Sequence, residues 1–234
     1  MSAFDPNLMQ DVRGRFAHVD ACPFQGPRIF FENAGGALTL KSVVETSATF
    51  AAIPDNQGRD NPAAKALGDI IERSKTDMGT LFGTKDGQFF VGESGTELTF
   101  RLIRTAAMGT DAGAVIGSTV EHPASRSAAT HWAQMAGKDY ISVPHDNETG
   151  AVTAEAYSAK MTPEVRVATI LHTSPVTGMG NDGAMGTRAV KSVGGIVFAE
   201  AEGGLGPDAF QVVATADMTL LVPGLVLGGL LLLR

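Results

Sequence analysis

Short apolar segments alternate with longer amphipathic ones from about residue 88 onward, and this alternation restricts the possible folds more than any other feature. The apolar segments have strand length, and bulky aliphatic side chains are frequent in them. We expect strands at Gln88–Val91, Ala114–Gly117, Asp139–Val143, Val165–Leu171 and Gly195–Phe198. We expect helices between them at Thr96–Met108, Pro123–Ala136, Ala154–Met161 and Ala184–Val193. Strands that alternate with helices predict an α/β fold, here a three-layer α/β/α sandwich around a mostly parallel sheet.

The segment before the first of these strands has mainly helical patterns. Apolar spacing predicts helices over Asp11–Val19, Leu40–Ile53 and Ala64–Phe82, with Pro62 suited to the start of the last one. The segment Arg28–Phe31, apolar after its arginine, predicts a short strand. Because no linker, repeat or low-complexity tract interrupts the chain, we expect one large domain over residues 1–234.

Charge and cysteine content exclude several classes of partner and site. The net charge is −7 and no block of Lys or Arg stands out, so we expect no nucleic-acid partner. Cys22 is the one cysteine of the chain, which excludes an internal disulfide and a cysteine metal cluster, and we expect no metal site. A free thiol fits a reducing compartment, and the acidic N-terminus lacks the pattern of a signal peptide. We therefore expect a cytoplasmic protein.

The C-terminal segment Met218–Leu233 is almost wholly apolar and admits two interpretations. It falls just short of the ~18–20 residues of a membrane span. Pro223 and Gly224 near its centre equally suit a turn between two buried strands. We favour the two strands, because nothing else in the chain indicates a membrane protein.

Between a predicted strand and a predicted helix stands Gly92-Glu93-Ser94-Gly95-Thr96-Glu97. Glycine allows the backbone to approach a ligand closely, and the first amides of a helix attract anions, so this segment can form an anion cradle. The same residues also suit an ordinary capping box, in which Ser94 or Thr96 caps the helix. Spacing alone does not separate the two.

Polar residues follow two further predicted strands. His122, in Glu121-His122-Pro123-Ala124, lies where a strand gives way to a helix and could stack on a ring or transfer protons. It could equally be a surface histidine before a helix-starting proline. The hydroxyl groups of His172-Thr173-Ser174-Pro175-Val176-Thr177-Gly178 could bind a ligand or belong to a plain polar loop.

The segment Gly178–Gly183 matches the dinucleotide pattern G-x-G-x-x-G, with Glu200 and Glu202 about twenty residues further on. Two observations weaken this interpretation. Several loop residues separate the strand from Gly178, where the pattern requires a tight turn, and the following helix is short. A match in a chain with 28 glycines is also easily obtained by chance.

Taken in order, these motifs resemble the class V aminotransferase and cysteine desulfurase-like family. The resemblance covers roughly residues 5 to 180 and is carried by Arg28–Gly36, Val91–Glu97, Ser118–Ala124, Asp146–Gly150 and Val165–Gly178. It implies a fold-type I protein that uses pyridoxal 5'-phosphate, acts on a small amino-acid substrate and usually forms a homodimer. By this resemblance Ser94, Gly95 and Thr96 would hold the cofactor phosphate, His122 would stack on its ring, and Ser174 and Thr177 would lie near it.

The chain diverges from the family pattern after about residue 180. The family places an aspartate near the position of Ala199 and a Schiff-base lysine in a segment that corresponds here to Leu221–Gly229. No lysine follows Lys191. We therefore predict weak, non-covalent cofactor binding and little or no transamination or sulfur abstraction, in an incomplete large domain without the family's smaller C-terminal domain. The alternatives are the dinucleotide-binding module above or a non-catalytic pseudoenzyme fragment.

Overall fold

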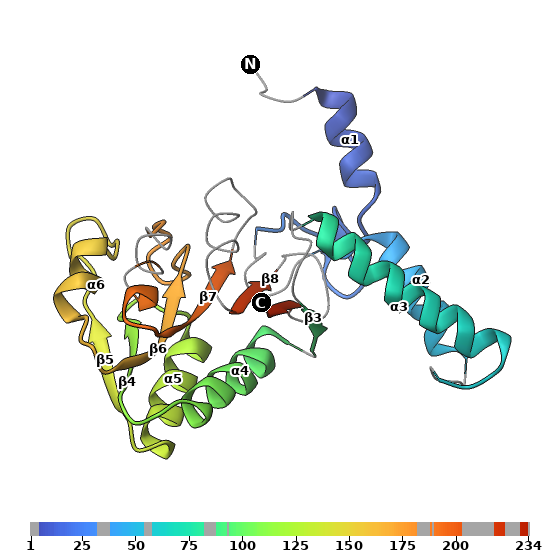
Figure 1. Ribbon diagram of the computed structural model, residues 1–234. Helices are drawn as coiled ribbons and strands as arrows, with labels where there is room; N and C mark the ends of the chain where they lie inside the picture. The colour runs from blue at the N-terminus through green and yellow to red at the C-terminus, as the bar shows by residue number, and fades with distance from the viewer. Residues whose placement is uncertain are drawn as a thin grey trace. The chain divides into compact units, whose positions relative to one another are not determined.

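The computed structural model describes residues 5–31, 38–53, 58–81, 88–92, 94–181, 188, 190–202, 218–222 and 230–233 (Figure 1). Its contacts divide the chain into two compact units, the first ending at Met78 and the second beginning at Gly79. The predicted features at Asn33–Gly36, Gly183 and Pro223–Gly229 lie outside the described residues.

The first unit is largely helical. It contains α1 (Pro6–Gly14), a two-stranded hairpin of β1 (Ala21–Cys22) and β2 (Gly26–Pro27), α2 (Lys41–Ala51) and most of α3 (Pro62–Leu81). The last two agree closely with the predicted helices.

Two predictions in the first unit were wrong. The first helix starts at Pro6 rather than at Asp11, because the side chain of Asp5 accepts a hydrogen bond from the Asn7 amide at 2.8 Å and caps the helix there. Residues 28–31 form no strand in the described part of the chain. The side chains of Ile29 and Phe31 are 86% and 89% exposed, so the apolar pattern here does not mark a buried segment.

The second unit is built on a seven-stranded sheet in the order β3-β9-β8-β7-β6-β4-β5. The strands are β3 (Gln88–Val91), β4 (Ala114–Ser118), β5 (Asp139–Val143), β6 (Val165–Leu171), β7 (Ile196–Glu202), β8 (Met218–Val222) and β9 (Leu230–Leu233). Pairing is parallel from β5 through β4, β6 and β7 to β8, and β9 runs antiparallel to both β8 and β3. The predicted α/β fold with a mostly parallel sheet is confirmed.

The apolar segment near the C-terminus forms β8 and β9, which pair antiparallel, as the prediction of two strands requires. The chain between them and the burial of their side chains lie outside the described residues. Within the described part of the chain, no helix has both the length and the apolar character needed to cross a membrane.

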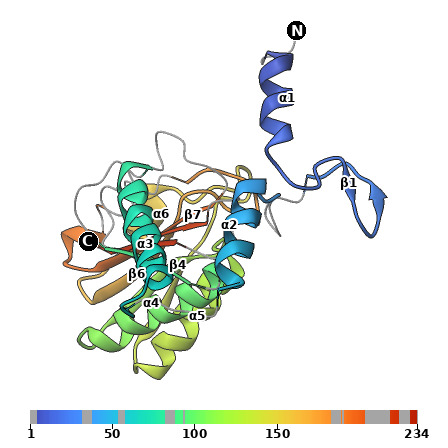
Figure 2. The same cartoon turned by 90° about the vertical axis from the view of Figure 1, so that its right-hand side faces the viewer.

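Helices cover both faces of this sheet. α4 (Gly95–Gly109) and α5 (Pro123–Met135) pack side by side on one face (Figure 1). Their core includes Val115 of β4 and Val167 of β6. On the other face lie α6 (Ala154–Lys160) and Val190, in a second core with Ile116 and Ala168, the strand residues next in sequence (Figure 2). Neighbouring strand residues therefore point into different cores, which is the three-layer arrangement expected from strand alternation.

Candidate functional site

The sheet topology brings the predicted motifs to one edge. β3, β4 and β6 run in the same direction, because β9 is antiparallel to both of its neighbours and the remaining strands are parallel. The loops that follow these three strands therefore leave the sheet at its carboxyl edge, where open α/β sheets bind ligands. These loops, with the first turn of α4, carry all of the predicted site residues: Ser94, Gly95, Thr96, His122, Ser174 and Thr177.

The first loop is closed by a helix cap. The Ser94 hydroxyl accepts a hydrogen bond from the Glu97 amide at 3.1 Å and so starts α4. Gly92 has no room for a side chain, because a Cβ there would lie 2.6 Å from Leu98. The cap engages only the third amide of α4, that of Glu97. The amides of Gly95 and Thr96 have no preceding helical turn to which they could donate. The Ser94 cap is therefore compatible with an anion cradle.

His122 lies on the second loop and caps α5. Its Nδ1 accepts a hydrogen bond from the Ala124 amide at 3.1 Å, and Pro123 occupies the first helical position. An Nδ1 that accepts a hydrogen bond carries no proton, so the geometry assigns the ring proton of neutral His122 to Nε2. The structure thus gives both predicted features at once, a helix-starting proline and a histidine at the carboxyl edge.

The third loop is tied to the second by Ser174, which is 1% exposed. Its hydroxyl donates to the Val120 carbonyl at 2.8 Å and accepts from the amides of Val176 and Thr177 at 3.1 and 3.2 Å. These three bonds use the full hydrogen-bonding capacity of a hydroxyl group. The Thr177 hydroxyl in turn donates to the Gly150 carbonyl at 2.9 Å. Both side chains hold the loops together.

Gly178 and Gly180 of the G-x-G-x-x-G match do not form the turn that a dinucleotide requires. Gly178 has a left-handed φ of 73° and its amide donates to the Ser174 carbonyl at 2.8 Å. Thr173 and Gly180 then pair antiparallel, so the segment folds back on the end of β6. A dinucleotide site needs the first glycine to lead directly from strand to helix, and the observed geometry therefore does not favour this alternative.

Sequence reasoning missed Glu121, the residue before His122. Its side chain is 2% exposed, and Oε1 accepts hydrogen bonds from the Ser118 amide at 3.2 Å and from the Ser118 hydroxyl at 2.9 Å. Burial raises the pKa of Glu121 to about 7, although the bonds from Ser118 oppose the rise. The spacing Ser-x-x-Glu, typical of a turn closed by side chains, was the available signal.

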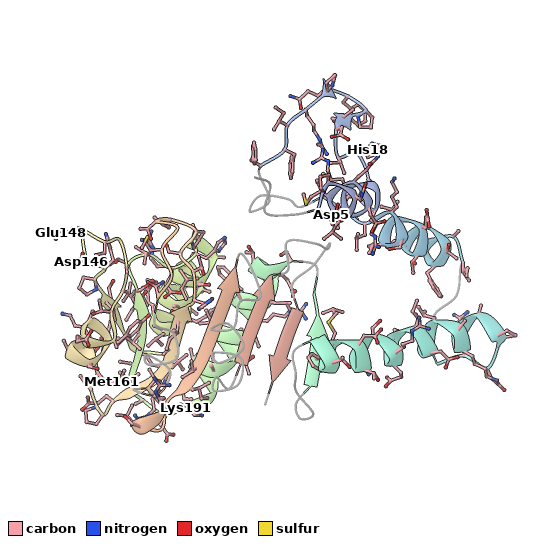
Figure 3. The ribbon with its side chains drawn as sticks, turned by 90° about the horizontal axis from the view of Figure 1, so that it is seen from above. Asp5, His18, Asp146, Glu148, Met161 and Lys191 are labelled. Carbon is pink, nitrogen blue, oxygen red and sulfur yellow. The ribbon has the colours of Figure 1, made fainter. Side chains whose placement is uncertain are left out.

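The described lysines of the second unit lie at the opposite, amino edge. Lys138 directly precedes β5, Lys160 ends the helix that leads toward β6, and Lys191 precedes β7. Figure 3 shows Lys191 near the end of the sheet at which β7 begins. Lys138 is 7% exposed and its ammonium group donates to the carbonyls of Thr110, at 3.0 Å, and Asp111. Lys85 lies outside the described residues.

Fold and loops together define an α/β domain of the kind that binds a ligand at the carboxyl edge of a parallel sheet. The chain belongs to the class-V aminotransferase family, whose model matches residues 29–208. Pyridoxal 5'-phosphate is the cofactor of this family, as predicted. Among curated protein sequences, none matches the chain.

Solved structures of cysteine desulfurases share the fold. CsdA from Escherichia coli is 20% identical, with a TM-score of 0.79 over 100% of this chain and 59% of that protein. The apo cysteine desulfurase from Thermococcus onnurineus NA1 is 17% identical, with a TM-score of 0.78 over 100% of this chain and 58% of that protein. A NifS-like protein is 16% identical, with a TM-score of 0.75 over 88% of this chain and 59% of its own. The chain thus spans less than two thirds of these relatives.

Proposed function

We propose that this domain binds pyridoxal 5'-phosphate non-covalently at the carboxyl edge of its sheet and has little or no aminotransferase or cysteine desulfurase activity. When bound in an enzyme of this family, the cofactor withdraws electrons from the Cα of an amino acid. One observation carries the proposal. The start of α4 and the His122 loop share the carboxyl edge, whereas the described lysines of the second unit lie at the other edge.

The residues at the carboxyl edge suit the phosphate and the ring. The amides of Gly95 and Thr96 and the Thr96 hydroxyl would receive the phosphate, with help from the positive end of the α4 dipole. His122 would stack on the ring from the neighbouring helix start. Ser94 would preserve the cap, whereas Ser174 and Thr177 would hold the surrounding loops in place through the bonds described above.

Two residues that the family uses for covalent chemistry, a lysine and an aspartate, are not found at their expected positions in this sequence. A Schiff base requires a lysine within reach, and the sequence has none after Lys191. Ala199, paired with Ile170 in the sheet, takes the place of the aspartate that the family places against the pyridine nitrogen. We further propose a cytoplasmic homodimer that binds a small amino acid.

Titration of the protein with pyridoxal 5'-phosphate, followed by absorbance and thermal shift, tests the proposal. We expect saturable binding and a rise in Tm by mass action. Thr96→Val should weaken binding about tenfold, because it removes one hydrogen bond to a charged group. Thr105→Val is the matched control, since Thr105 is exposed on the same helix and bonds only to the Arg101 carbonyl.

Borohydride treatment and mass spectrometry should detect no pyridoxyl group on any lysine. A modified lysine, or turnover of cysteine or alanine, would overturn the claim of lost catalysis. No binding of the cofactor at all would leave a non-catalytic fragment. Saturable binding of reduced nicotinamide cofactor, abolished by Gly178→Val, would instead support the dinucleotide alternative.

A further inference from the structure

Buried polar groups gather beneath the turn between β4 and α5. Glu121 is 2% exposed, and its Oε1 accepts the two hydrogen bonds from Ser118. Among the described residues, its other oxygen, Oε2, has no hydrogen-bond partner. The same is true of the Tyr140 hydroxyl of β5 and of Thr169 Oγ1 of β6 in this part of the chain. Because buried polar groups are normally paired, these three atoms require an explanation.

The position of Gly117 in β4 limits how far apart two of these atoms can be. A Cβ placed on Gly117 would lie 2.9 Å from the Tyr140 hydroxyl oxygen and closer still to Thr169 Oγ1. The two oxygens are therefore separated by less than twice this distance, which is below about 5.8 Å. Hydrogen bonds between oxygens extend to about 3.0 Å, so one water molecule can join two oxygens that are up to about 6 Å apart.

Glu121 belongs to the same cluster. Burial, together with the charge of Glu121, raises the pKa of Tyr140, so this hydroxyl group stays neutral and can both donate and accept a hydrogen bond. Ser118, whose hydroxyl donates to Glu121 Oε1 at 2.9 Å, directly follows Gly117 in the sequence. The carboxyl group is therefore anchored beside the region that Gly117 leaves without a side chain.

We propose that this cluster binds one buried water molecule, held by Thr169 Oγ1, the Tyr140 hydroxyl and Glu121 Oε2. Buried waters in proteins typically make about three hydrogen bonds to polar groups that are otherwise unpaired. Water both donates and accepts, so it can serve a carboxyl oxygen and two hydroxyl groups together. This inference goes beyond the proposed function and needs no bound cofactor.

A water molecule suits the three oxygens better than the other arrangements that could pair them. A direct hydrogen bond between two of the oxygens would leave the third unpaired. A bound cation would require a charged carboxylate, whereas burial raises the pKa of Glu121 to about 7, so that a large part of this group is neutral near pH 7. A neutral ligand with both donors and acceptors fits this chemistry.

A high-resolution crystal structure of the unmodified protein, grown without cofactor, tests the proposal directly. We expect an isolated density peak at ~2.5–3.0 Å from at least two of the three oxygens. The double variant Thr169→Val, Tyr140→Phe should lack this peak, because two of its three partners are removed. Absence of the peak in the unmodified protein, or a side chain from another segment in its place, would overturn the proposal.

Unfolding in urea provides a second test, in which the sign of the effect decides. Thr169→Val removes the hydroxyl group and keeps the size of the side chain. If Oγ1 binds a water molecule, the equilibrium constant for unfolding should rise about three- to tenfold. If Oγ1 is unpaired, the constant should stay the same or fall, because a buried polar group without a partner is itself unfavourable.

Thr105→Val is the matched control, since Thr105 is exposed on α4, and it should change the equilibrium constant little. If Thr169→Val does not fold, Tyr140→Phe takes its place with the same expectation. A constant that stays the same or falls in the variant measured would overturn the proposal. All of these measurements are made without cofactor, so failure of pyridoxal 5'-phosphate to bind would overturn the proposed function alone.

Discussion

The buried carboxyl group of Glu121 predicts an unusual dependence of stability on pH. In the unfolded chain it ionises near its ordinary pKa of 4.5, and in the folded protein near 7. Between these values the folded state binds more protons than the unfolded state, so the free energy of unfolding falls as the pH rises. The contribution is fully present below pH 4.5 and is lost above about pH 7. The difference in pKa corresponds to about 3 kcal/mol.

This contribution is measurable, because a typical domain is stable by only ~5–15 kcal/mol. We propose urea unfolding of the unmodified protein, Glu121→Gln and Glu148→Gln at several pH values from 4.5 to 9. The difference between Glu121→Gln and the unmodified protein should change by about 3 kcal/mol across this range, in favour of the variant at high pH. Glu148→Gln should follow the unmodified protein. Parallel curves for the unmodified protein and Glu121→Gln would refute the burial of an ionisable group in this turn.

Two further substitutions test the packing at the carboxyl edge. Gly117→Ala places a Cβ 2.9 Å from the Tyr140 hydroxyl and should destabilise the protein by about 1–3 kcal/mol, measured by thermal unfolding. Gly109→Ala, with no atom within 4 Å of the added Cβ, should cost little, and an equal loss in both variants would contradict the close packing described at Gly117. Ser174→Ala leaves the Val120 carbonyl and two amides without their partner and should cost about 1–3 kcal/mol. The exposed control Ser158→Ala should be nearly neutral, and Ser174→Ala with the stability of that control would refute the bridging role.

Local patterns were sufficient to predict the sheet. Gln88–Val91, Asp139–Val143 and Val165–Leu171 form strands with the predicted bounds, because apolar segments of this length between polar turns have few alternatives in a core. The site loops followed from the same reasoning, since the ends of parallel strands meet at one edge. Arg28–Phe31 shows the limit of the method, because a strand also needs a neighbour, and neighbours are not visible in a local pattern.

The burial of Glu121 could not be read from its immediate sequence. A glutamate before a histidine and a proline is normally expected at the surface. Its environment is made by Tyr140 and Tyr157, which follow in later elements and reach the turn only when β5 and α6 are in place. Charge burial is thus a property of the assembled sheet. By contrast, the cap formed by Ser94 depends on residues three apart in sequence and was predictable.

The positions of the described lysines of the second unit support the proposal that this domain binds the cofactor without catalysis. A helix start attracts a phosphate through backbone amides, which any sequence retains as long as the helix forms. Covalent attachment instead requires one particular side chain with a neutral amine within reach. Lys138 is buried and donates to two backbone carbonyls at the amino edge, so its amine is committed to holding a loop. On the proposed function, the α4 start and His122 would hold the phosphorylated ring without a described lysine of the second unit at the same edge.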